Sequence, residues 1–180
     1  MHMAATKVWT LEEVDALPED GNKYELLYGE LLVSPAPGPR HELIAARLNE
    51  LLVPYVSEHQ LGLVFLPRSI VQRKRSRAEP DLSVRASFDP DLSWDDAPTP
   101  FLVVEILSPS NRRTGLASKR RYYTEIGVDE YWIANPARGV VIVVRPGHAD
   151  VETSDTLTWH PKGAATPLTI DVRALFGTAR

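Results

Sequence analysis

The sequence contains no cysteine among its 180 residues, which excludes disulfide bonds, thiolate zinc sites and cysteine nucleophiles. It also has no apolar run near the roughly 20 residues that a membrane span requires. The N-terminus MHMAATKVWT lacks the apolar core of a secretory signal, so we expect a cytoplasmic protein without membrane contact. Its five histidines are scattered without ligand spacing, so any metal would be oxygen-bound, such as Mg²⁺ or Mn²⁺.

The length of 180 residues is enough for one globular domain with a hydrophobic core. The composition agrees, since 43% of the residues are apolar and 24% are charged. We expect residues 1–180 to form this domain, with residues 1–7 as a flexible N-terminal tail. The net charge of −4 hides an asymmetry. Residues 67–121 hold eleven Lys and Arg against seven Asp and Glu, a local balance of +4 that leaves −8 elsewhere. Such a basic segment suits a ligand that carries phosphate.

Hydrophobic periodicity predicts an α/β fold. Helices are expected at TLEEVDAL (10–17), with a Thr10–Glu13 capping box, from about Arg40 to His59, and at LASKRRYYTEIG (116–127). A hairpin is expected at YELLYGELLVS (24–34), and a strand followed by a short helix at TIDVRALF (169–176). Further strands are expected at GLVFLP (62–67), SIVQ (69–72), PDLSV (80–84), FLVVEIL (101–107), EYWIA (130–134), VVIVVR (140–145) and DTLTWH (155–160).

The expected connections indicate how these strands pair. The helix at 116–127 joins FLVVEIL to EYWIA, which is typical of a right-handed crossover between parallel neighbours. The hairpin-like segments imply antiparallel neighbours as well. We therefore predict a single-domain α/β protein with a mixed β-sheet flanked by helices.

Glu105 lies inside FLVVEIL, a run that predicts a strand buried on both faces. A carboxylate removed from water needs a partner. Asp81 is the best candidate neighbour, because it stands 24 residues earlier (105 − 81) at the start of another strand. Two carboxylates repel unless one takes a proton or a divalent cation binds both, with water and a substrate phosphate completing its shell. The pair indicates a metal site, and a structural ion pair of Glu105 with an arginine is the alternative.

Phosphoryl chemistry also calls for a cation near the negative charge that develops on the phosphate. The position nearest to Glu105 on the same face of its strand is 107, but this residue is Leu107 and carries no charge. The next candidate for the cation is Lys119 in the following helix. If Tyr122 and Tyr123 anchor that helix, Lys119 points to the sheet while Arg120 faces solvent. The alternative for Lys119 is a solvated helix lysine.

An ordered set of motifs resembles the Uma-type family of endonucleases over roughly residues 8–145. These motifs are YELLYGELLVSPAP, RHE opening a helix, EPDLSV, LVVEILSPSNRR, a lysine in the next helix and GVDEYWIANP. The resemblance implies the restriction-endonuclease-like, PD-(D/E)XK fold and magnesium-dependent hydrolysis of phosphodiester bonds, with DNA as the expected substrate. By position, Asp81 corresponds to the motif's Asp, Glu105 to its second acid and Lys119 to its lysine, here carried by a helix.

Three more residues match polar positions in the N-terminal part of that family. Glu25 or Glu30 and His41 are therefore added to the candidate catalytic residues. The alternative is that Glu25 and Glu30 form the polar face of a hairpin, and that His41 is a surface residue near a helix start.

Basic residues on both sides of the Glu105 strand are candidates for contacts that hold a nucleic-acid backbone without reading bases. They are Arg73, Lys74, Arg75, Arg77, Arg112 and Arg113. The alternative for RKRSR (73–77) is a charged connection that keeps sheet edges apart. A nuclease that cuts two strands is expected to be a homodimer, for which VVIVVR or EYWIA could supply an edge.

Two departures from the family pattern motivate a second hypothesis. Thr114 and Gly115 stand where family members often carry an acid after SPS, and Asn135 stands where WIVDP is the usual pattern. The second hypothesis is a nuclease-fold module with weak or no catalysis that binds DNA or another protein.

Overall fold

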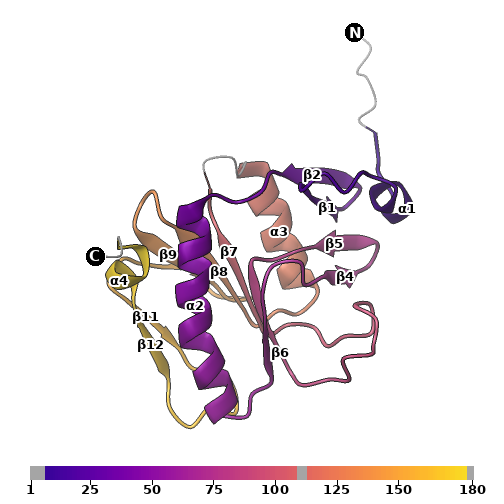
Figure 1. Cartoon of the computed structure of the whole chain (residues 1–180). Helices are drawn as coiled ribbons and strands as arrows, with labels where there is room; N and C mark the ends of the chain where they lie inside the picture. The colour runs from indigo at the N-terminus through magenta and orange to yellow at the C-terminus, as the bar shows by residue number, and fades with distance from the viewer. Residues whose placement is uncertain (1–6, 109–112, 178–180) are drawn as a thin grey trace.

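The computed structural model of the chain describes residues 7–108 and 113–177, without the side chains of 113 and 114. Figure 1 shows the arrangement of the elements. In chain order they are α1 (Leu11–Asp15), β1 (Lys23–Leu27), β2 (Glu30–Ser34), α2 (Pro39–Glu58), β3 (Leu63–Phe65), β4 (Val71–Arg73), β5 (Ser76–Ala78), β6 (Leu82–Arg85), β7 (Leu102–Ile106), α3 (Arg113–Glu125), β8 (Glu130–Asn135), β9 (Val140–Val144), β10 (Val151–Thr153), β11 (Thr156–Trp159), β12 (Leu168–Asp171) and α4 (Val172–Phe176).

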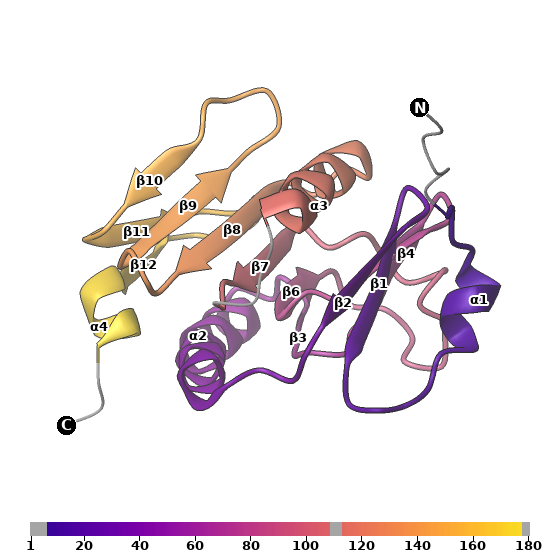
Figure 2. The ribbon, with the colours of Figure 1, turned by 90° about the horizontal axis from the view of Figure 1, so that it is seen from above.

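The central sheet has six strands in the order β10-β9-β8-β7-β6-β3. Strands β7 and β8 are parallel and are joined through α3, whereas the other neighbours in this sheet pair antiparallel. Figure 2 shows α2 and α3 on opposite sides of β7 and β8. The predicted mixed sheet flanked by helices, with its parallel crossover, is confirmed.

The two faces of β7 differ in character because side chains alternate along a strand. Leu102, Val104 and Ile106 belong to the apolar core that also contains α2. Val103 belongs to a second core that contains residues of α3. Every residue of β7 is buried, and by alternation Glu105 lies with Val103 on the α3 side, with 2% of its surface exposed.

A second sheet has four antiparallel strands in the order β2-β1-β5-β4, and a third consists of β11 and β12. The predicted hairpin at 24–34 forms β1 and β2, and α1 begins with the predicted capping box of Thr10 and Glu13. The prediction had a single sheet, whereas the described residues form the central sheet and two smaller ones. Strand β10 at the edge of the central sheet was not predicted.

The interpretation of RKRSR as a connection is wrong. Its residues close the β4–β5 hairpin, and Lys74 and Arg75 form the turn with φ angles of 51° and 60°. Two successive residues at positive φ are typical of a two-residue hairpin turn. A run of charged residues lacks the alternation of apolar and polar residues that predicts a strand, so nothing in the sequence indicated the short strand β5.

The predicted dimer edges are also wrong. Strand β9 lies between β10 and β8, and β8 lies between β9 and β7, so neither VVIVVR nor EYWIA is at an edge. The homodimer itself stays a prediction. None of the described helices is both long and apolar enough to cross a membrane.

Candidate active site

Asp81 and Glu105 face each other across neighbouring antiparallel strands. Leu82 of β6 pairs with Val104 of β7, and continuing this register by one residue sets Asp81 opposite Glu105. The Asp81 backbone N–H donates to the carbonyl of Val104, which fixes this arrangement. Both carboxylate residues are buried, with 6% and 2% of their surface exposed. The fold therefore brings the two sequence-predicted acids together on one face of the sheet.

The carboxylate of Asp81 has two different oxygens. Oδ2 accepts a hydrogen bond of 2.7 Å from the backbone N–H of Ile106, and His41 Nε2 lies 3.0 Å from the same oxygen. Oδ1 lies 3.5 Å from Lys23 Nζ. Burial raises the pKa of Asp81, but the hydrogen bond with His41 and the charge of Lys23 outweigh it and lower this pKa to about 2.

Lys119 links Glu105 to Glu25. Its ammonium lies 2.8 Å from Glu105 Oε1 and 2.8 Å from Glu25 Oε2, and the Tyr123 hydroxyl donates to Glu105 Oε1 at 3.0 Å. Burial lowers the pKa of Lys119, but the two carboxylates more than offset this and raise it above its ordinary value. Lys119 thus remains a fixed positive charge, and Arg120, one residue on, faces solvent and pairs with Asp150.

Glu25 and Glu105 differ in their other partners. Glu25 Oε1 accepts a hydrogen bond of 2.8 Å from the backbone N–H of Glu79, so both of its oxygens have a donor. Burial raises the pKa of Glu105, although the nearby ammonium groups of Lys119 and Lys23 act in the opposite direction. Glu25 therefore holds Lys119, while Glu105 Oε2 has no hydrogen-bond donor among the described residues.

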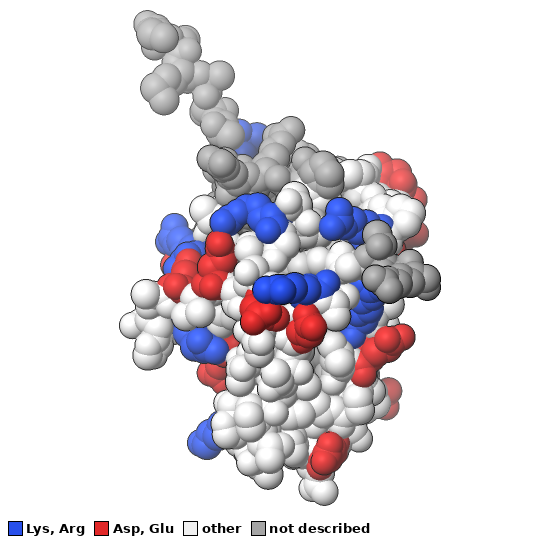
Figure 3. Space-filling view, turned by 90° about the vertical axis from the view of Figure 1, so that its left-hand side faces the viewer, with Lys and Arg blue, Asp and Glu red and all other residues white. Residues whose placement is uncertain are grey.

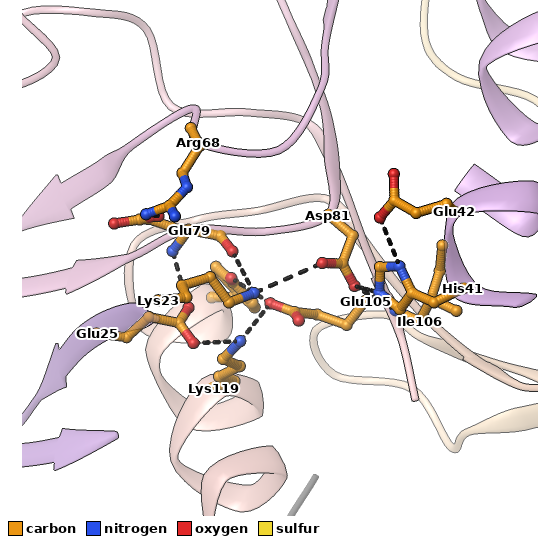
Figure 4. A network of polar contacts seen from close by, with 11 residues as sticks. Lys23, Glu25, His41, Glu42, Arg68, Glu79, Asp81, Glu105, Ile106 and Lys119 are labelled. Atoms are coloured by element: carbon orange, nitrogen blue, oxygen red, sulfur yellow. Dashed lines mark hydrogen bonds and ion pairs between the residues drawn. The ribbon is translucent and has the colours of Figure 1, made fainter. Parts of the chain in front are cut away.

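Lys23 was missed by the sequence analysis, which began the hairpin one residue later. Its ammonium donates to the Glu79 carbonyl at 2.9 Å and lies between Glu79 and Asp81 in Figure 4. Lys23 stands two residues before Glu25 on β1, so both side chains share one face of that strand. This alternation of a lysine and a glutamate was a signal that could have identified it.

These groups line a cavity of about 390 Å³. Its charged lining consists of Lys23, Glu25, Glu30, His41, Arg68, Asp81, Glu105 and Lys119. The opposite wall is largely apolar and comes from β2 and the segment after it, with Leu31, Leu32, Val33, Pro35, Ala36 and Pro37. The six candidate catalytic residues thus surround one cavity, with Glu30 the exposed member among them.

Most of the candidate nucleic-acid contacts lie elsewhere. The Arg73 guanidinium donates to the carbonyls of Asp95 and Ala97, and Arg77 pairs with Asp15. Arg112 lies outside the described residues, as does the side chain of Arg113. On the face drawn in Figure 3, blue and red side chains lie side by side in the upper half, and the lower half is mostly uncharged.

The donor set at the cavity fits a hard divalent cation. Asp81 Oδ1 and Glu105 Oε2 receive no hydrogen bond from any described residue, although both side chains line the cavity. Within the described part of the chain, no group of three or more His, Asp and Glu is placed to hold a metal. Mg²⁺ keeps several waters and is bound by one or two carboxylates together with substrate phosphate oxygens, so two carboxylates suffice.

Comparison with known proteins relates the chain to a nuclease family and to a solved structure. A family model named Uma2, described as "Putative restriction endonuclease", matches residues 11–173. The chain is also similar to a crystal structure described as a putative nuclease belonging to DUF820 from Anabaena variabilis ATCC 29413, with 23% identity and a TM-score of 0.80. The alignment covers 93% of this chain and 97% of that one, which supports the shared fold. No curated protein matches the chain.

Proposed function

The chain belongs to the Uma2 family, and from this we propose that it is a metal-dependent nuclease that hydrolyses the phosphodiester bonds of DNA. The observation that carries the proposal is the pair of buried carboxylates, Asp81 and Glu105, set opposite each other beside the Lys119 ammonium. Burying such a cluster has a free-energy cost, and perturbed carboxylates in a cavity are typical of sites that do chemistry.

Asp81 and Glu105 are the residues that would hold Mg²⁺ or Mn²⁺, through the oxygens that have no hydrogen bond from the described residues. A divalent ion held there would polarise the phosphate oxygens and lower the pKa of a water molecule. His41 and the backbone N–H of Ile106 fix the orientation of Asp81 by holding Oδ2, so Oδ1 is the oxygen that would bind the cation. His41 is therefore a positioning residue in this proposal.

Lys119 supplies the fixed positive charge of the site. Glu25 and Glu105 hold its ammonium from two sides and keep it protonated, so it is already placed before any substrate enters. A preorganised ammonium stabilises the negative charge that grows on the phosphate in the transition state. Glu25, with both oxygens engaged, acts as the anchor of Lys119.

One observation favours a second candidate function, a nuclease-fold module that binds DNA or protein without catalysis. Lys119 and Lys23 already place an ammonium beside each of the two acids, so both acids have a cationic partner within the chain. Asn135, by contrast, does not bear on the choice. Its side chain accepts a hydrogen bond from the backbone N–H of Arg138 and is not part of the cavity lining.

Nicking of supercoiled plasmid DNA separates the two functions. We expect the wild type to nick DNA with Mg²⁺ or Mn²⁺, to stop when EDTA is added, and to lose at least about 100-fold in rate on Asp81→Asn. The matched control is Asp150→Asn, which removes an exposed acid that pairs with Arg120 and should leave the rate unchanged. DNA binding that persists in Asp81→Asn without any cleavage by the wild type would support the module instead.

A further inference from the structure

Lys23 is the one charged group of the cavity that contacts Asp81 Oδ1 among the described residues. Its ammonium lies 3.5 Å from this oxygen, beyond hydrogen-bond geometry but within ion-pair distance. The only strong bond that holds the ammonium among the described residues is the one of 2.9 Å to the Glu79 carbonyl. The Lys23 ammonium therefore has one short hydrogen bond and one longer ion pair, and the ion pair is with Asp81 Oδ1, an oxygen that would also bind the proposed metal.

The charges of the site favour a cation at this place. Lys119 contacts Glu105 and Glu25. Asp81 lies opposite Glu105 and has His41 as its other partner, so one ammonium is set against three carboxylates. The Lys23 ammonium is in ion-pair contact with Asp81 Oδ1 and is the second positive charge of the cluster.

We propose that Lys23 and the divalent ion are alternative partners of Asp81 Oδ1, so that the ammonium must leave this oxygen when the ion binds. This inference rests on the proposed function, because it presumes that Asp81 holds a metal. Two cations in contact with one oxygen repel each other, and the flexible four-carbon stem of lysine lets its head group move.

The cavity offers the displaced ammonium a new partner when substrate is present. The Lys23 side chain lines the cavity and is 21% exposed, so its ammonium can reach a phosphate that enters there. Without a phosphate, metal binding leaves Lys23 with the Glu79 carbonyl as its one remaining partner among the described residues. Metal binding and phosphodiester binding consequently favour each other, and Lys23 is a positioning residue for metal loading.

The test is the affinity of the whole chain for Mn²⁺, measured without substrate by the electron paramagnetic resonance signal of free Mn²⁺. We expect Lys23→Gln to bind Mn²⁺ about tenfold more tightly than the wild type. The matched control is Arg68→Gln, which removes one positive charge from the same cavity. Arg68 pairs with Glu79 at 3.7 Å and not with Asp81, so we expect less than about a threefold change.

Each other outcome overturns a defined claim. Unchanged or weaker Mn²⁺ binding by Lys23→Gln overturns the exchange at Asp81, and equal tightening in both variants shows a general charge effect instead. No Mn²⁺ binding by any of the three proteins removes the metal site itself and with it the proposed function.

A second measurement keeps the inference testable should Lys23→Gln fail to fold by circular dichroism. Wild-type crystals soaked in Mn²⁺ should show anomalous density at Asp81, with the Lys23 ammonium beyond ion-pair distance from Oδ1. Density at Asp81 with Lys23 still in contact with Oδ1 overturns the proposal.

Discussion

The two faces of strand β7 form a natural comparison, because five consecutive residues serve two different purposes. Toward α2, Leu102, Val104 and Ile106 pack into a wholly apolar core. Toward α3, Val103 packs among apolar residues, but Glu105 meets the ammonium of Lys119. Both faces are buried to the same degree, so burial alone does not distinguish the stabilising face from the functional one.

The difference between the faces lies in what burial does to the free energy. On the α2 face each buried side chain stabilises the fold by removing apolar surface from water. On the α3 face the ion pairs roughly offset the desolvation of their own charges, so they contribute little net stability. The charged cluster therefore adds little to the net stability, which comes from the apolar side chains packed on both faces.

The largest effect is expected for Lys119→Met. This change leaves Glu25 and Glu105 buried against each other without the ammonium between them, which should lower the free energy of unfolding by about 3–5 kcal/mol at pH 7. The lost stability should return as the pH falls toward 5. Burial raises the pKa of Glu105 in the folded state, so folding favours its protonated form below that pKa.

Urea unfolding at pH 7 and pH 5 measures this effect, with Lys162→Met as the control. Lys162 is exposed, and its replacement should change the free energy of unfolding by less than about 0.5 kcal/mol at either pH. A loss for Lys119→Met that does not depend on pH would show that packing, and not unbalanced charge, is the cause.

The next effect tests the α2 face. Leu102→Ala removes a fully buried side chain from the apolar core and should lower the free energy of unfolding by about 2–5 kcal/mol. Because Leu102 points away from the acids, the folded variant should bind Mn²⁺ as tightly as the wild type. Weaker Mn²⁺ binding by folded Leu102→Ala would mean that the two faces are not independent.

Lowering the pH should also distinguish the two faces, with an effect on the free energy of unfolding between those of the other variants. The pKa of Asp81 is lowered from 3.8 to about 2, so this residue stabilises the fold above pH 4, and that contribution is lost as the pH falls toward 2. The shift corresponds to a loss on the order of 2 kcal/mol. Urea midpoints between pH 5 and pH 2 should fall less steeply in Asp81→Asn than in the wild type.

Leu102→Ala is the informative control for this titration. It should lower the urea midpoint by a similar amount at every pH, since no titrating group is lost with it. A wild type and an Asp81→Asn variant with parallel pH profiles would contradict the lowered pKa of Asp81.

The comparison also explains which features could be predicted from the sequence. An apolar run broken only by Glu105 identified β7, and the phase of a helix placed Lys119 toward the sheet, because both depend on short-range periodicity. Asp81 was chosen as the neighbour of Glu105 because a strand start and the middle of an adjacent strand can bring two carboxylates together, and because both residues match the family motif. The strand and the helix phase have their signal in consecutive residues, whereas this pair depended on the motif.

The features that were missed depend on distant parts of the chain. The short strand β5 pairs Arg77 with Leu26 of β1, and no apolar alternation within RKRSR announces it. Lys23 becomes a member of the site only because β1 pairs with β5 and packs beside α3, and because its side chain contacts Asp81 and Glu79. Long-range pairing of short polar strands has no local signature, so the basic hairpin and the second ammonium required the structure.

The smallest stability effect, and the sharpest test of the comparison, is expected for Glu105→Gln. The amide keeps the volume of the side chain and can still accept a hydrogen bond from Tyr123, while Lys119 retains Glu25 as its counterion. Removing a buried charge whose pKa is already raised should change the free energy of unfolding by no more than about 1 kcal/mol. Plasmid nicking should nevertheless fall by at least about 100-fold.

Urea unfolding and plasmid nicking of the same preparation of Glu105→Gln decide the matter. A stable but inactive variant places function and stability on opposite faces of one strand. An unstable variant would show that the ion pair of Glu105 with Lys119 holds the fold, and the two faces would then differ in chemistry but not in purpose. An active variant would leave Glu105 without a part in metal binding, and the second acid of the site would have to be sought at Glu25 or Glu30, which line the same cavity.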